Sequence, residues 1–309
     1  MYYPYLRARQ FELIALRELA LENSLTKIIP VLEPVKESIN NLSIANKVFT
    51  DKLISPYLIV NPLHGEKSGD TDYYLNYISK LYNSKYKQAF LYSNNREYIT
   101  SMFDKYNISD SMIISLGNIS DEKDFIDLCK DDRASHIMLL EPNKYRGLDR
   151  DIKKLEKTYI RLDDSFEKQT RNADYLDLEA HKFTEEHFYY TEDSYQGFSD
   201  FTVLSSEYTE GGSMPRAVVI HITYDNNDYE NQIWIRHFTS ETNDSVSNVQ
   251  GKFIEAAEKA VAFFNEFNLN NTAINELVKF ATDAKYPGLG TVKKISIKNH
   301  LLVIESILN

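Results

Sequence analysis

The sequence has a single cysteine, Cys129, which excludes an intramolecular disulfide. Its setting in Asp-Leu-Cys-Lys is typical of a packed helix position rather than of a nucleophile. Only 10 glycines and 8 prolines are present, too few for low-complexity disorder. No apolar stretch approaches the roughly 18 residues needed to span a bilayer, and the N-terminus lacks the layout of a signal peptide. We therefore expect a folded cytoplasmic protein with no membrane segment.

Positive charge is also scarce, because 35 Lys and Arg face 46 Asp and Glu, a net charge of −11 at pH 7. This balance argues against extensive nonspecific nucleic-acid binding, which needs a positive field, although a local basic groove stays open. Zinc-ligand spacings of Cys and His, the Walker pattern and the Gly-x-Ser-x-Gly elbow are all missing. The 42% hydrophobic residues are nevertheless enough for a large core.

Eight short apolar runs, each next to charged or polar residues, dominate the pattern. They cover residues 2–6, 27–32, 57–60, 88–92, 112–116, 136–140, 158–162 and 200–204. Amphipathic stretches of helical periodicity separate the runs, as in βα units with buried parallel strands. Eight such units close a barrel whose chemistry sits at the C-terminal strand ends. We therefore predict an α/β fold, a (β/α)8 TIM-like barrel.

The pattern changes after the eighth run. Residues 217–224 and 232–238 alternate apolar and polar side chains around a turn at 225–228, which predicts a β-hairpin. We expect a barrel domain over residues 1–267 that includes the hairpin as an insertion at about 206–240 and closes with a helix at 252–267. Helices at 272–284 and 292–308 should form a C-terminal extension over 268–309, packed on the barrel. We expect the hairpin to pack on the long segment 167–196 and on the last helix, as a cap beside the mouth.

Four carboxylates, Glu33, Glu141, Asp163 and Asp200, fall at the predicted ends of four strands. Carboxylates gathered at a barrel mouth can hold a divalent cation or divide into an acid and a base. The alternative is that each caps the following helix or pairs with an arginine. His221 on the hairpin is a fifth catalytic candidate, as a proton shuttle, and its alternative is a packed histidine.

Cationic and polar side chains at these ends predict contacts to a small anionic ligand, because guanidinium groups fit phosphate and carboxylate. The candidates are Arg7, Arg9, Lys36, Asn61, Arg161, Arg171 and Arg236. Their alternative is the neutralisation of buried acids in internal ion pairs.

Several segments resemble the Beta protein family of bacteria and phages, in particular an uncharacterised branch whose members carry sce-prefixed family names. They are Tyr3-Pro4-Tyr5-Leu6-Arg7-Ala8-Arg9-Gln10, Pro30-Val31-Leu32-Glu33-Pro34-Val35, and residues 169–175, 197–201, 217–224 and 286–294. The resemblance runs nearly end to end, although Ala8 stands where many relatives have glycine. It implies a gene that often lies beside one for a nuclease-like protein, in a two-component system that suggests antiviral, phage-directed defence.

Two hypotheses about function follow, and whether the chain is an enzyme stays open between them. The first is a hydrolase or transferase acting on a phosphorylated or nucleotide-like substrate at the barrel mouth. The second is a non-catalytic ligand-sensing or regulatory component that binds the nuclease-like partner through its hairpin and C-terminal helices. Strand-end acids that converge on an open cavity would favour the first hypothesis. Strand-end acids that are all paired with arginines would favour the second hypothesis.

Overall fold

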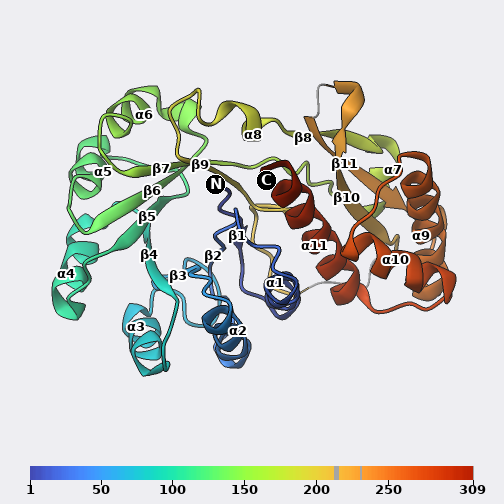
Figure 1. Cartoon of the computed structure of the whole chain (residues 1–309), viewed down its shortest axis with the longest axis horizontal. Helices are drawn as coiled ribbons and strands as arrows, with labels where there is room; N and C mark the ends of the chain where they lie inside the picture. Colours follow the sequence, from blue (N-terminus) through green and yellow to red (C-terminus); the bar gives the residue numbers. More distant parts are fainter. Residues whose placement is uncertain (212–215, 230–231, 309) are drawn as a thin grey trace. The chain divides into compact units, whose positions relative to one another are not determined.

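The computed structural model describes residues 1–211, 216–229 and 232–308, and Figure 1 shows their fold. Contacts divide the chain into two compact units. Unit 1 contains Met1–Leu13, Arg17–Asp164 and Glu186–Phe201, and unit 2 contains Ile14–Leu16, Ser165–Glu185 and Thr202–Asn309. This division differs from the boundary expected at residue 267, because the hairpin shares a hydrophobic core with the C-terminal helices.

Unit 1 is a (β/α)8 barrel, which confirms the predicted fold class (Figure 1). Its strands are β1 (Tyr5–Leu6), β2 (Val31–Leu32), β3 (Tyr57–Ile59), β4 (Lys87–Tyr92), β5 (Ser111–Ser115), β6 (Ala134–Leu140), β7 (Thr158–Asp163) and β9 (Gly197–Asp200). They pair in this order, and all neighbours are parallel. Parallel bridges from Tyr2 to Phe198 and to Ile28 join the two ends of the sheet.

The barrel interior is filled by side chains and is therefore a core rather than a pore. Its buried cluster includes Tyr3, Tyr5, Val31, Tyr57, Ile59, Leu91, Met112, Ile114, Met138, Ile160, Leu162 and Phe201. Short runs of buried apolar residues produce this filling, because inward-facing side chains of the barrel strands meet on one axis. A ligand in unit 1 must therefore bind at an end of the barrel.

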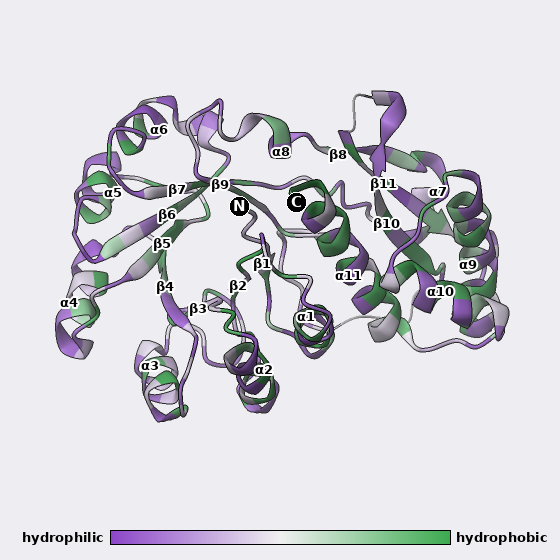
Figure 2. Cartoon of the chain, in the orientation of Figure 1, coloured by the Kyte–Doolittle hydropathy of each residue, from purple (hydrophilic) through white to green (hydrophobic). Residues whose placement is uncertain are grey.

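Helices separate the barrel strands, as the amphipathic stretches predicted. They are α1 (Gln10–Leu21), α2 (Asn40–Asp51), α3 (Thr71–Lys80), α4 (Arg96–Tyr106), α5 (Glu122–Cys129), α6 (Arg146–Ile152) and α8 (Glu186–Tyr189), with a 3-10 turn at Pro142–Tyr145. Asp121 caps α5 by accepting a 3.0 Å hydrogen bond from the backbone N–H of Asp124. Hydrophobic and hydrophilic residues share these helices (Figure 2), as expected where one face covers a core.

Unit 2 contains the predicted hairpin, formed by β10 (Val219–Asn226) and β11 (Gln232–Thr239). A third antiparallel strand, β8 (Ala180–Thr184), pairs with β11. The helices of this unit are α7 (Tyr175–Leu178), α9 (Val249–Glu266), α10 (Thr272–Thr282) and α11 (Leu289–Leu308), with 3-10 turns at Asn172–Asp174 and Asn227–Tyr229. Packing of the hairpin on the 167–196 segment and on the terminal helix is confirmed by β8 and by α11, whose Asn299 donates to the Thr223 carbonyl at 2.8 Å.

One detail of the sequence prediction is wrong. The eighth barrel strand covers Gly197–Asp200 rather than 200–204, since Phe201 leaves the strand and packs into the barrel core. The segment between β7 and β9 also contributes a strand to the second sheet, in addition to its helices. Phe253 and Phe263 of α9, the helix expected to close the barrel, share one hydrophobic core with the hairpin strands.

No helix in the described part of the chain is long and apolar enough to cross a membrane.

Candidate functional site

Glu33, directly after β2, is completely buried and is occupied by protein groups on both carboxylate oxygens. It forms an ion pair with Arg7 and accepts a hydrogen bond from the Tyr5 hydroxyl at 2.9 Å. Its other oxygen accepts the backbone N–H groups of Leu63 at 2.9 Å and His64 at 3.2 Å. Glu33 therefore ties the ends of β1 and β2 to the loop after β3, which matches the internal-pairing alternative for Glu33 and Arg7.

Asp163 ends β7 and is held by a two-pronged ion pair with Arg161. The Arg161 Nε lies 2.6 Å from one carboxylate oxygen and the Nη2 lies 3.2 Å from the other. Burial raises the pKa of the Asp163 carboxyl, Arg161 opposes this change, and the charges of Asp200 and Glu141 raise it further. The Arg161 Nε also lies 3.4 Å from a carboxylate oxygen of Glu186 in α8, so one arginine forms ion pairs with two acids.

The remaining two acids of the predicted set differ in exposure. Asp200, the last residue of β9, is buried and accepts a 2.6 Å hydrogen bond from the Tyr2 hydroxyl. Glu141, directly after β6, is partly exposed, has a left-handed backbone with φ of 47°, and pairs with Lys144. The carboxylates therefore do stand at strand ends, as predicted, but each has a protein partner.

The cationic side chains predicted to contact a ligand also interact with other groups of the protein. Lys36 pairs with Glu66 at 3.1 Å on the exposed surface, and Arg9 precedes α1, where its backbone N–H donates to Glu12 at 3.2 Å. In unit 2, exposed Arg171 pairs with Asp174 at 2.7 Å.

Two further candidates, Arg236 and His221, also belong to unit 2. Arg236 pairs with Glu179, and its guanidinium lies 4.8 Å from the ring centre of Phe263. His221 is hydrogen-bonded to His237 across the hairpin. Nowhere among the described residues do three His, Cys, Asp or Glu side chains gather in an arrangement that could hold a metal ion.

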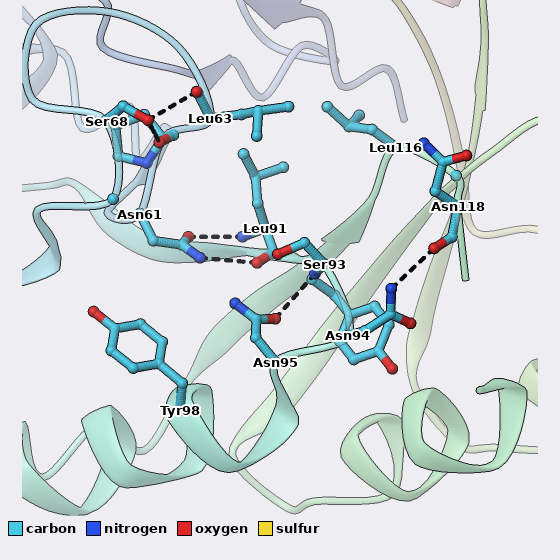
Figure 3. A pocket seen from close by; sticks show the side chains of 14 residues that line it. Asn61, Leu63, Ser68, Leu91, Ser93, Asn94, Asn95, Tyr98, Leu116 and Asn118 are labelled. Carbon is cyan, nitrogen blue, oxygen red and sulfur yellow. Dashed lines mark hydrogen bonds between the residues drawn. The ribbon is translucent and has the colours of Figure 1, made fainter. Parts of the chain in front are cut away.

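A pocket of about 350 Å³ lies at the C-terminal ends of β3, β4 and β5 (Figure 3). It is lined by Asn61, Pro62, Leu63, Ser68, Gly69, Leu91, Tyr92, Ser93, Asn94, Asn95, Tyr98, Leu116, Gly117 and Asn118. Leu91 belongs to the barrel core and Leu116 packs against it. This volume falls in the range of small-molecule sites, and the strand ends of a barrel are where such sites form.

Asn61 was the one predicted site residue that lines this pocket. Its side-chain amide makes two 2.8 Å hydrogen bonds to the backbone of Leu91, one to the carbonyl and one from the N–H. The amide thus continues the pairing of β3 with β4 beyond the end of β3 and forms a fixed wall. Its polar atoms are therefore occupied by the barrel itself.

The loops after β4 and β5 are joined to each other by hydrogen bonds. Asn94 donates from its Nδ2 to the carbonyl of Asn118 at 3.1 Å and accepts the backbone N–H and hydroxyl of Ser120 at 2.9 and 2.8 Å. Asn94, Gly117 and Asn118 have φ of 59°, 95° and 57°. Asparagine and glycine tolerate this left-handed region best, which explains their presence in the two loops.

Three polar groups of the lining have no protein hydrogen bond within the described chain: the hydroxyl of Ser93, the Nδ2 of Asn95 and the side-chain amide of Asn118. None of these three residues is among the sequence-predicted candidates, which are mostly charged side chains. A signal was nevertheless present, since asparagine follows three consecutive strands at positions 61, 94 and 118. The lining contains no acidic or basic side chain.

Comparison of the chain with family models, with curated proteins and with solved structures finds no match. Membership of the Beta protein family therefore stays a hypothesis based on the motifs.

Proposed function

We propose that this chain is a non-catalytic ligand-binding component, whose barrel holds a small uncharged polar molecule in the pocket over β3, β4 and β5. One observation carries the proposal. The pocket is lined by amides, hydroxyls and leucines, with no acidic or basic side chain, and three of its polar groups make no protein hydrogen bond within the described residues. Acid–base catalysis requires a titratable group within hydrogen-bond reach of the substrate. The hydroxyls of Tyr92 and Tyr98 in the lining are bound to Asp124 and Thr71, and the remaining neutral donors and acceptors suit a neutral ligand.

The state of the strand-end acids supports the same choice. Glu33 is occupied on both oxygens, Asp163 is clamped by Arg161, and Asp200 accepts from Tyr2. None of these acids lines the pocket. This is the arrangement expected of a sensor rather than of a hydrolase.

A hydrolase or transferase acting on a phosphorylated or nucleotide-like substrate is the second candidate function, and one observation favours it. The pKa of Asp163 is raised by burial at the C-terminal end of β7. A carboxyl group that keeps its proton above its usual pH range is suited to act as a general acid.

The resemblance to the Beta protein family supports a nuclease-like partner encoded by a neighbouring gene. In this proposal the barrel reports the presence of its ligand, and the partner responds. Co-expression with the neighbouring gene product and affinity purification with and without ligand would test the pairing. We expect a stable complex whose amount depends on the ligand.

The ligand-binding proposal is tested on the purified chain. Denaturation of freshly purified protein and mass spectrometry of the released small molecules should identify a retained uncharged compound, which is then titrated back by calorimetry. Asn118→Asp should weaken binding. Asn107→Asp is the matched control, because Asn107 is also an exposed asparagine with a left-handed backbone, at the end of α4 and away from the pocket lining. Binding that survives Asn118→Asp would contradict this site.

A further inference from the structure

We infer that the ligand of this pocket is a nucleoside, recognised mainly through the edge of its base by Asn118. The inference rests on the proposed ligand-binding function and adds the chemical class of the ligand. Four features of the pocket carry it: the fixed backbone of Asn118, the single donor of Asn95, the apolar walls beside Tyr98, and the uncharged lining.

The backbone of Asn118 is held from both sides, while its side chain is left for a ligand. The backbone N–H donates to the Tyr145 hydroxyl at 3.0 Å, and the carbonyl accepts from Asn94 at 3.1 Å. The side-chain amide presents one donor and one acceptor side by side, and it has no partner in the described chain. An asparagine amide of this kind can pair with two adjacent atoms of a base edge, as in the recognition of adenine.

Asn95 and Ser93 supply a second recognition point from the loop after β4 (Figure 3). The Oδ1 of Asn95 accepts the backbone N–H of Ser93 at 3.0 Å, which fixes the orientation of the amide and leaves its Nδ2 as a donor. The Ser93 hydroxyl can donate or accept. The ligand must therefore present a hydrogen-bond acceptor to Asn95 in addition to the edge that Asn118 binds.

The walls of the pocket suit a flat ring better than a sugar alone. Leu63, Leu91 and Leu116 give apolar surface, and the hydroxyl of Tyr98 is tied to Thr71 at 2.8 Å, which positions its ring at the pocket edge. Bases stack on aromatic rings and tolerate apolar contact on both faces. A free sugar carries hydroxyl groups around its ring, and those facing the leucines would lose their hydrogen bonds to water without replacement.

The lining contains no lysine, arginine or histidine to pair with a phosphate. Phosphate recognition normally uses such cations or a set of backbone N–H groups. A 5′-phosphate would therefore meet no cationic side chain of the lining. The preferred ligand is the nucleoside, or a nucleotide whose phosphates remain in solvent.

The experiment is a calorimetric titration of the full chain with adenosine, guanosine, cytidine, uridine, AMP, ribose and glucose. We expect at least one nucleoside to bind, ribose and glucose not to bind, and AMP to bind no more tightly than adenosine. Asn118→Asp keeps the size of the side chain but replaces its donor with an acceptor. It should weaken nucleoside binding by about tenfold or more, whereas Asn107→Asp should leave binding unchanged.

Each outcome separates this inference from the function on which it rests. Binding of glucose, or of another uncharged compound retained from the cell, without nucleoside binding would overturn the nucleoside class but keep the ligand-binding function. A chain that retains no compound and binds none of the probes would overturn both. If Asn118→Asp melts at a lower temperature than Asn107→Asp, the binding test uses the variant Ser93→Ala in its place. This substitution should leave the fold intact, because the Ser93 hydroxyl has no hydrogen bond in the described chain. Unchanged nucleoside affinity in Ser93→Ala would then contradict the assignment.

Discussion

His221 and His237 face each other across the hairpin with their Nδ1 atoms 2.7 Å apart. One ring must donate and the other must accept, so the pair is stable only with at least one neutral imidazole. The ring of His181 lies 5.4 Å from that of His237, and Phe166 and Tyr175 pack against both members of the pair. The structure therefore places His221 within an imidazole cluster of unit 2, as in the packed alternative to a proton shuttle.

Acid should destabilise unit 2 through this cluster. Burial lowers the pKa of His221 to about 3 and that of His237 to about 2, and the charges of neighbouring histidines and of Lys293 add to the effect. Glu167, 3.5 Å from the Nδ1 of His181, is the acid that faces the cluster. An unfolded histidine has a pKa of about 6.5, so the unfolded state binds more protons below that pH. The contribution of the cluster to the free energy of unfolding should be fully present above pH 6.5. It should be lost as the pH falls from about 6.5 to 3.

The measurement is urea unfolding followed by the fluorescence of Trp234, which is the only tryptophan and lies on β11. The free energy of unfolding should decrease by up to about 1.4 kcal/mol per pH unit for each histidine. His237→Gln separates this effect from the protonation of carboxylates, because it removes one titrating ring. A pH dependence equal to that of the wild type in this variant would show that the cluster is not responsible.

Glu33→Gln should strongly destabilise the barrel. The substitution leaves the buried guanidinium of Arg7 without its charged partner, a loss of about 3–5 kcal/mol for a buried ion pair. Glu66→Gln is the matched control, because it breaks the exposed pair with Lys36, and solvent screening leaves such a pair with little effect on stability. Urea unfolding followed by circular dichroism measures both. Equal effects of the two substitutions would contradict the structural role of Glu33.

Gly65→Ala should distort the loop that forms one side of the pocket. Gly65 has φ of 93°, and an added Cβ would lie 2.3 Å from the backbone oxygen of Val35. Gly69 in the same loop has φ of 72°, but an added Cβ would meet nothing within 4 Å. Gly69→Ala should therefore cost only the backbone strain of about 1–2 kcal/mol, and Gly65→Ala should destabilise the chain more. Thermal unfolding of both variants would show a similar loss of stability if the close approach to Val35 has no role.

Asp163→Asn distinguishes the two candidate functions. If the chain is a ligand-binding component, the variant should bind the pocket ligand with unchanged affinity, because Asp163 is not part of the lining. A survey of phosphodiester and nucleotide hydrolysis by the wild-type chain should detect no turnover. Turnover by the wild type that disappears in Asp163→Asn, with binding retained, would instead support the enzyme.

Local sequence patterns were sufficient for the barrel strands and for the hairpin. The apolar runs predicted all eight barrel strands, with a shift of a few residues at β9, and alternation predicted both arms of the hairpin. The amphipathic stretches between the runs form helices, among them α4 (Arg96–Tyr106). These features depend on periodicity and on the caps of single elements, which residues close in the chain determine.

The sequence by itself also placed Glu33, Glu141, Asp163 and Asp200 at strand ends, but only the tertiary structure decided their partners. Arg7 meets Glu33 across 26 positions, and Tyr2 meets Asp200 across 198. The pocket likewise depends on loops 24 or more positions apart in the sequence. A side chain's chemistry is set by the groups that surround it and by its burial. Closure of the barrel brings those groups together from all along the chain, and no local pattern encodes that neighbourhood.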